Sequence, residues 1–388
     1  MSRRNELKNQ ILKHLLFHGR ATRPELVALT GTRAATVFEA IGELKDEGLI
    51  CEPERRGKRT GRRAPELNID PDCCHVLGVE LRPDGCIGVI VDAAGNILHK
   101  YRTSAESRNT LDEVKQEILF LLQKLREKSS DQWHLVKGLG FADPGLVDVH
   151  KRFSIRAVNV PGWRELETGR YLEGVSGLAS GVWPEAMVKT FLEYLKTIDE
   201  KPESIFHLAT DGGIGGGFIK NGELFIGNSS RAMEIGHLTV DPSGPRCRCG
   251  NCGCLEAVAG SAALAEKVAE ARRAGVDLGG LPEKFSMKSF ADHSMKNKGV
   301  RIIADELCRD LGQALSAVVM MLNPERIVIS GEFIRLGDFL LDSLRRELEL
   351  RCFPEAVRRL KISLSELDTF DTALGAAIMM RNAVLLKD

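Results

Sequence analysis

The sequence predicts an α/β protein with mixed sheets, preceded by a small winged helix-turn-helix domain. Helical patterns and a basic loop occupy the first 70 residues, and strand pairs alternate with helices after Pro71. Glycine-rich turns separate the apolar strands. At roughly 100–200 residues per domain, the chain is long enough for two or three domains and a large core.

Helical spacing dominates the N-terminal segment. Within residues 5–18 the apolar side chains recur at helical spacing; they are Leu7, Ile11, Leu12, Leu15 and Leu16. A second helix is expected after Thr22, because Thr22 and Glu25 can form a capping box and Pro24 suits the first turn. Gly31 marks a tight turn, and a third amphipathic helix follows. Two helices joined by such a turn are typical of a helix-turn-helix, whose later helix enters the major groove.

The third helix and the segment after it supply the candidate DNA contacts. Those on the outward face of the helix are Arg33, Thr36, Phe38 and Glu39. For Phe38, an inward and packed side chain is the alternative. Strand-like residues 49–52 and 66–69 then flank a basic loop, which we expect to be a wing that contacts phosphates or the minor groove. Its basic residues are Arg55, Arg56, Lys58, Arg59, Arg62 and Arg63. The alternative is a solvated basic linker.

The charge distribution supports a DNA-binding domain over residues 1–70. Residues 1–68 hold 14 Lys and Arg against 9 Asp and Glu, a net charge of +5, and the remainder carries −5. A basic segment on an acidic body indicates contact with a polyanion, here a double-stranded DNA operator.

Neither a membrane span nor a secretion signal is present in the sequence. No apolar run reaches the ~18–20 residues of a membrane span. The charged N-terminus lacks the apolar stretch of a secretory signal. We therefore expect a cytoplasmic protein without membrane contact, whose ten cysteines stay reduced and serve as core residues or metal ligands.

The remaining chain shows strands, a long helix and a set of ordered motifs. Three strands are expected over 75–81, 86–92 and 96–103, followed by a helix over 111–128. The glycines of 212–217 form a turn whose backbone N–H groups are suited to a phosphate, although such turns are often only hairpins. The motifs in chain order are "PGLVD", "NVPGW", "GGIGGGFIKNGEL", "EIGHL" and "CRCGNCGCLEA".

In this order the motifs resemble the ROK family of bacterial sugar kinases and sugar-responsive repressors. The resemblance covers nearly the whole chain, and the N-terminal domain resembles that of the family's repressors. It implies an actin-like ATPase (ribonuclease H-like) fold with two lobes. The small lobe would comprise 71–184 with 371–388, and the large lobe, with the zinc site and the oligomer interface, 185–370. A homodimer or tetramer is expected from the family.

The resemblance also implies a structural zinc ion and an effector site. The family holds zinc with one histidine and three cysteines, and the matching residues are His237, Cys247, Cys249 and Cys254. Three thiolates and an imidazole complete a closed tetrahedral site. Cys252 is a spare cysteine that could substitute as a ligand. The positions that bind sugar hydroxyls in the family correspond to Asn159, Glu234, His237 and Glu256, so a sugar or sugar-phosphate effector is expected.

Two departures from the family's kinases predict that the chain is not an enzyme. The phosphate loop reads "ELRPD" at 80–84, where Arg82 and Pro83 replace glycines and should prevent a tight turn. Asp84 adds a charge that repels phosphate. The best match to the catalytic run puts Val182 in place of the aspartate base, with Glu185 on the following helix. Asp211 also precedes the second glycine turn, where the family has Gly-Thr.

The sequence therefore predicts a non-catalytic DNA-binding transcriptional regulator, a repressor controlled by a sugar-like effector. Two alternatives remain open. The first is a sugar kinase that phosphorylates a hexose with ATP and carries an added DNA-binding domain. The second is a regulator controlled by a protein partner that docks on the body.

Overall fold

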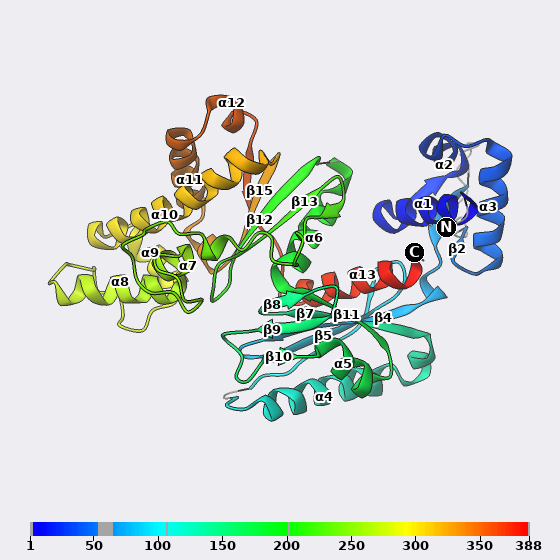
Figure 1. The fold of residues 1–388 in the computed structure, drawn as a ribbon, viewed down its shortest axis with the longest axis horizontal. Helices are drawn as coiled ribbons and strands as arrows, with labels where there is room; N and C mark the ends of the chain where they lie inside the picture. Colours follow the sequence, from blue (N-terminus) through cyan, green and yellow to red (C-terminus); the bar gives the residue numbers. More distant parts are fainter. Residues whose placement is uncertain (1–2, 53–64, 106–107, 201, 387–388) are drawn as a thin grey trace. The chain divides into compact units, whose positions relative to one another are not determined.

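The computed structural model describes residues 3–52, 65–105, 108–200 and 202–386 (Figure 1). The chain divides into two compact units, Met1–Val188 with Asp368–Asp388 and Lys189–Leu367. The first unit contains the N-terminal domain and a small lobe, and the second is a large lobe. In the described part of the chain, no helix has both the length and the apolar character that a membrane crossing needs.

The N-terminal domain consists of three helices and a small antiparallel sheet. The helices are α1 (Arg3–His18), α2 (Arg23–Thr30) and α3 (Ala34–Asp46). The strands lie in the order β1 (Arg20–Thr22), β3 (Glu66–Ile69) and β2 (Ile50–Cys51). The three expected helices are present. The expected wing residues Arg55, Arg56, Lys58, Arg59, Arg62 and Arg63 lie outside the described residues.

The start and end of α2 follow the local chemistry that the sequence indicates. The Thr22 hydroxyl accepts the N–H of Glu25, and the Glu25 carboxylate accepts the N–H of Thr22 at 2.7 Å, which completes the capping box. Gly31 ends the helix with φ = 60°, a left-handed conformation that glycine adopts without strain.

The apolar core of the N-terminal domain continues into the body. The buried leucines of α1 belong to one cluster that also contains Cys74, Ala93 and Leu385 of the small lobe. The buried Arg381 side chain joins the same segments, because it donates to the main-chain oxygens of Leu16 and Ala93 at 3.1 and 3.2 Å. The N-terminal domain therefore packs directly on the small lobe.

A five-stranded mixed sheet forms the small lobe. Its strands lie in the order β11 (Ala179–Pro184), β7 (Val136–Asp143), β4 (His75–Arg82), β5 (Gly85–Val91) and β6 (Ile97–Arg102). Helix α13 (Asp371–Leu385) packs on one face and α4 (Leu111–Lys128) on the other (Figure 1). A Cβ atom on Gly78 would lie 1.9 Å from the carbonyl oxygen of Ala373, so glycine there lets α13 approach closely.

A second, three-stranded sheet extends the small lobe. Its order is β10 (Arg164–Leu166), β9 (Phe153–Arg156) and β8 (Leu146–Asp148), and α5 (Thr168–Ser176) follows it. The loop between β9 and β10 contains the expected effector residue Asn159.

The large lobe is a second five-stranded sheet with helices. The strands lie in the order β14 (Glu223–Leu224), β13 (Gly215–Lys220), β12 (Ser204–Thr210), β15 (Arg326–Gly331) and β16 (Lys361–Leu364). The helices are α6 (Glu185–Lys196), α7 (Leu255–Ala259), α8 (Ser261–Arg273), α9 (Met287–Ser294), α10 (Lys298–Leu322), α11 (Asp338–Arg351) and α12 (Pro354–Val357). The apolar faces of α7 to α12 form one core with β12 and β15. The loop from β14 to α7 contains the cysteine cluster.

Candidate metal centre, effector residues and DNA-binding surface

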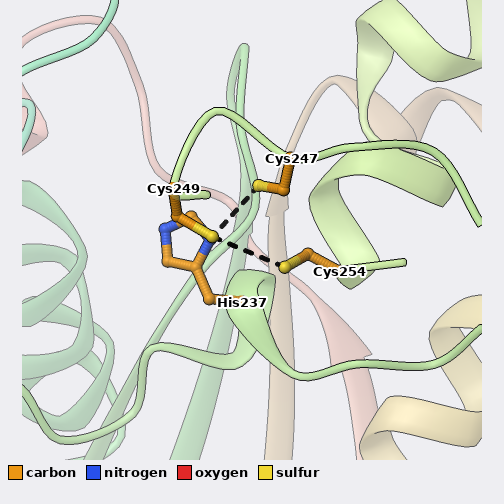
Figure 2. Close-up of side chains that lie close together, drawn as sticks. All are labelled: His237, Cys247, Cys249 and Cys254. Carbon is orange, nitrogen blue, oxygen red and sulfur yellow. Dashed lines mark hydrogen bonds between the residues drawn. The ribbon is translucent and has the colours of Figure 1, made fainter. Parts of the chain in front are cut away.

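Four predicted metal ligands come together in the large lobe. His237 ends the short 3₁₀ turn η4 (Ile235–His237), Cys247 and Cys249 lie in the loop that follows, and Cys254 immediately precedes α7 (Figure 2). Their ligand atoms all lie within 4.8 Å of one another. The Cys247 Sγ is 3.7 Å from the His237 Nδ1, and the Sγ atoms of Cys249 and Cys254 are 3.6 Å apart. A tetrahedral zinc with bonds of about 2.3 Å needs ligand separations of about 3.7 Å, so the geometry fits this ion.

A tight loop creates this arrangement. The Cys247 N–H donates to the Asn251 oxygen at 2.7 Å, and the Gly250 N–H donates back to the Cys247 oxygen at 3.0 Å. Gly253 has φ = 65°, and a Cβ atom there would lie 1.4 Å from the Asp241 oxygen, so the turn requires glycine. Cys252 is exposed and does not belong to the four-residue group. The conformation of the loop thus brings three of its four cysteines to the cluster and leaves Cys252 outside it.

The surroundings of the cluster favour a neutral Cys254 thiol when no cation is bound. Burial raises the pKa of the Cys254 thiol to about 12, and the neighbouring sulfurs of Cys249 and Cys247 add to the shift. Ligation of a divalent cation requires thiolates, and the positive charge offsets the cost of creating them. The donor set, one imidazole with three sulfurs, is typical of a structural zinc site.

Two of the predicted effector residues lie beside this centre. Glu256 is on α7, two residues after Cys254, and its Oε2 accepts the N–H of Ile214 at 3.0 Å. Burial raises the pKa of the Glu234 carboxyl to about 7, and the charge of Glu256 contributes to the shift. The loop that carries the cysteines therefore also positions a carboxylate against the glycine turn. Asn159 lies in the small lobe, where it is exposed.

The large-lobe glycine turn is occupied by internal contacts. Ile214, in the middle of the turn, gives its N–H to Glu256, and the Asp211 carboxylate pairs with the Lys189 ammonium at 2.6 Å. The Lys189 side chain is largely buried, whereas the Asp211 side chain is 43% exposed, so the ion pair is open to water on the Asp211 side. One N–H of the glycine turn is thus already bonded to a carboxylate, that of Glu256.

The small-lobe turn corrects one prediction. Arg82 pairs with Gly85 across β4 and β5, so Pro83 and Asp84 form a two-residue hairpin turn, and the expectation that these residues prevent a tight turn is wrong. The contacts count against the charge argument, because the Asp84 carboxylate pairs with Arg82 and Arg102 at 3.2 Å each and its negative charge is therefore compensated. The turn therefore holds an ion-pair network.

The structure buries Val182, the residue that the sequence match places at the position of the catalytic base. Val182 lies in the middle of β11, and its side chain is 1% exposed in the small-lobe core. The expected catalytic run precedes a helix, and the residue that begins α6 is Glu185. A carboxylate is therefore retained directly after β11. The expectation that Glu185 lies on the following helix is confirmed.

The predicted base contacts lie on the surface of the N-terminal domain. Arg33 immediately precedes α3, and Thr36, Phe38 and Glu39 follow in its first two turns. All four are exposed. Phe38 is 47% exposed, so it points outward and the packed alternative is excluded. The inward face of α3 buries Val37, Ala40, Ile41 and Leu44 instead.

Three buried polar residues escaped the sequence analysis. Asp143 is fully buried at the end of β7, Arg381 is 4% exposed within α13, and Lys189 is 7% exposed on α6. A charged residue inside an apolar helix, as in "AAIMMRNAVLL", is a usable signal for Arg381. No comparable signal marks Asp143 or Lys189, because their partners are distant in sequence.

Known proteins similar to this chain are regulators and kinases of one family. The xylose repressor of Bacillus spizizenii is 24% identical over 94% of this chain and 92% of its own length. The DNA-binding transcriptional dual regulator NagC of Escherichia coli is 25% identical over 95% of this chain and 90% of its own length. The crystal structure of a ROK family transcriptional regulator, a homolog of the E. coli MLC protein, covers 99% of this chain and 96% of its own, with a TM-score of 0.85 and 23% identity.

A ROK hexokinase from Thermus thermophilus covers 78% of this chain and 97% of its own, with a TM-score of 0.65 and 20% identity. These likenesses identify the body as the actin-like ATPase fold, as the sequence predicts. The sequence profile described as "ROK family" matches residues 76–383, which is most of the chain. The chain belongs to the ROK family.

Proposed function

We propose that the chain is a DNA-binding transcriptional regulator, a repressor whose body responds to a sugar or sugar phosphate. The observation that carries this proposal is the helix-turn-helix in front of the ROK body, with Arg33, Thr36, Phe38 and Glu39 exposed on α3. The family profile begins at residue 76, so the domain is an addition to the family body. The relatives named above as repressors support the same function.

The DNA contact would combine two kinds of interaction. Side chains on α3 would read base edges in the major groove, and the wing arginines would neutralise phosphates. A homodimer or tetramer, expected from the family, would bind an operator with two half-sites about one or two helical turns apart. The carboxylates Glu234 and Glu256, with Asn159, would accept hydroxyl hydrogen bonds from the effector.

His237, Cys247, Cys249 and Cys254 would hold one zinc ion, which would fix the loop before α7. When bound, the ion supplies structural cross-linking, because four protein ligands leave no open position for chemistry. Cys254 precedes Glu256 by two residues, so the loop that carries the metal ligands determines where the Glu256 carboxylate lies.

A non-catalytic body is the second part of the proposal. It is supported by the large-lobe glycine turn, where the Glu256 carboxylate already accepts the Ile214 N–H and the Asp211 carboxylate lies at the start of the turn. Glu185 is the observation that favours the alternative, a sugar kinase, because it keeps a carboxylate after β11.

The direct test begins with selection of bound fragments from genomic DNA. Fluorescence anisotropy then measures the affinity for the selected operator with and without each sugar of a panel. The proposal requires sequence-selective binding that at least one sugar changes.

A further inference from the structure

The loop of residues 157–163, between β9 and β10, carries the effector residue Asn159 and is attached to the core at three points. Ala157, Val160 and Trp163 are 5%, 2% and 1% exposed, whereas Val158 is 49% exposed and Asn159 also faces solvent. The Ala157 N–H donates to the Trp163 oxygen at 2.8 Å, which closes the loop on itself. The position of Asn159 therefore depends on how firmly Trp163 is held.

A single buried carboxylate holds Trp163. The indole Nε1–H donates to the Asp143 Oδ2 at 2.8 Å, and the Asp143 side chain has no exposed surface. The ring also stacks on Phe141, with ring centroids 5.8 Å apart. A buried indole N–H needs an acceptor, and a buried carboxylate needs donors, so each group satisfies the other.

The remaining lone pairs of Asp143 are also used. The Ser154 hydroxyl donates to the Asp143 Oδ2, and the Gly145 N–H donates to Oδ1 at 2.9 Å. The Ser154 hydroxyl also contacts that of Thr168, the first residue of α5. Asp143 thereby connects the end of β7 with β9, the loop and α5. The side chains of Asp143 and Ser154 have no exposed surface, so neither contacts an effector itself.

We infer that Asp143 is a positioning residue for effector recognition, which acts by fixing the 157–163 loop through Trp163. This inference rests on the proposed function for the role of Asn159. The structural part, that the Asp143–Trp163 hydrogen bond sets the loop conformation, stands on the contacts alone. Trp163 is the second positioning residue, and Asn159 is the contact residue.

The first test uses Trp163→Phe, which keeps an aromatic ring in the core and removes the N–H donor together with part of the indole ring system. Trp133→Phe is the matched control, because Trp133 is half-buried in the same lobe outside the loop. Hydrogen–deuterium exchange of the 157–163 amides should rise at least tenfold in Trp163→Phe and stay unchanged in Trp133→Phe. Unchanged exchange in Trp163→Phe, in a protein that melts like the wild type, would overturn the inference.

The second test measures binding of xylose, glucose, N-acetylglucosamine and the 6-phosphates of the last two by calorimetry. For a sugar that binds the wild type, Trp163→Phe should weaken affinity at least tenfold with faster loop exchange. Asn159→Ala should weaken it without a change in exchange. Wild-type affinity in Trp163→Phe would overturn the link between Asp143 and recognition. If no sugar binds the wild type, sugar control fails, while the exchange measurement still decides whether Asp143 fixes the loop.

Discussion

The guanidinium of Arg381, near the C-terminal end of the chain, donates a hydrogen bond to the main-chain oxygen of Leu16 in α1 at 3.1 Å. Leu16 belongs to the last turn of α1, where carbonyl groups lack helical partners and the helix dipole favours a cation. The same side chain donates to Ala93 in the turn between β5 and β6. One buried residue thus connects the DNA-binding domain with two segments of the body.

Replacing Arg381 should loosen this junction. In Arg381→Met the Leu16 and Ala93 oxygens lose a charged donor, at a cost of about 1–3 kcal/mol for each buried group left unpaired. We expect faster deuterium exchange at the end of α1 and in the β5–β6 turn, with the large lobe unchanged. Arg359→Met, an exposed arginine of the large lobe, is the control. Equal exchange in wild type and Arg381→Met would show that the junction does not depend on this residue.

The metal assignment gives a prediction with an internal control. Purified protein should contain about one zinc per chain by elemental analysis. Cys249→Ser should lose the metal and lower the melting temperature, because the loop before α7 would lose a ligand. The Cys252→Ser variant, which changes an exposed cysteine, should keep both the metal and the wild-type melting temperature. Metal loss in Cys252→Ser, or retention in Cys249→Ser, would contradict the four-ligand assignment.

Glu185, the carboxylate directly after β11, allows a direct test of whether the body is catalytic. Phosphorylation of glucose with ATP, measured by ADP release, should not exceed the background of the assay, because the Glu256 carboxylate already accepts the Ile214 N–H in the large-lobe glycine turn. If the wild type shows activity that Glu185→Gln abolishes, the body is a kinase and the non-catalytic proposal is wrong.

The capping box of α2 predicts an acid-sensitive helix start. Hydrogen bonds from the Thr22 N–H and hydroxyl lower the pKa of the Glu25 carboxyl below 4.5. A lowered folded-state pKa means that the stabilisation is present above the unfolded pKa and is lost as the pH falls through the folded one. The α2 amides should therefore exchange faster at low pH, after correction for intrinsic rates. In Glu25→Gln this acid-dependent increase should be absent; if it persists, another group causes it.

The sequence predicted the fold well where local chemistry decides it. The capping box at Thr22 and Glu25, Gly31 and the leucine spacing of α1 are each readable within a few residues, and all of them formed. The cysteine cluster was readable because its ligands lie within 18 residues of one another.

Long-range partners were not predictable in this way. Trp163 bonds to Asp143, and Arg381 to Leu16, only because separate elements fold together. No regular spacing in the sequence indicates either pair. The wrong prediction about the turn at 80–84 came from judging a turn by residue identity. Pro83 and Asp84 still turn tightly because the hairpin register demands it.

Binding to DNA tests the central claim most directly. Anisotropy over a salt series should show sequence-selective binding of the full-length protein to an operator selected from genomic DNA. Arg33→Ala should weaken that binding by about 1–3 kcal/mol and leave affinity for scrambled DNA unchanged. Replacing Arg59 and Arg62 with alanine should weaken binding to the operator and to scrambled DNA alike. The slope of log affinity against log salt concentration should fall by about one unit per lost phosphate contact. If the full-length protein selects no sequence over scrambled DNA, or residues 71–388 alone bind the operator equally well, the chain is not a regulator of this kind.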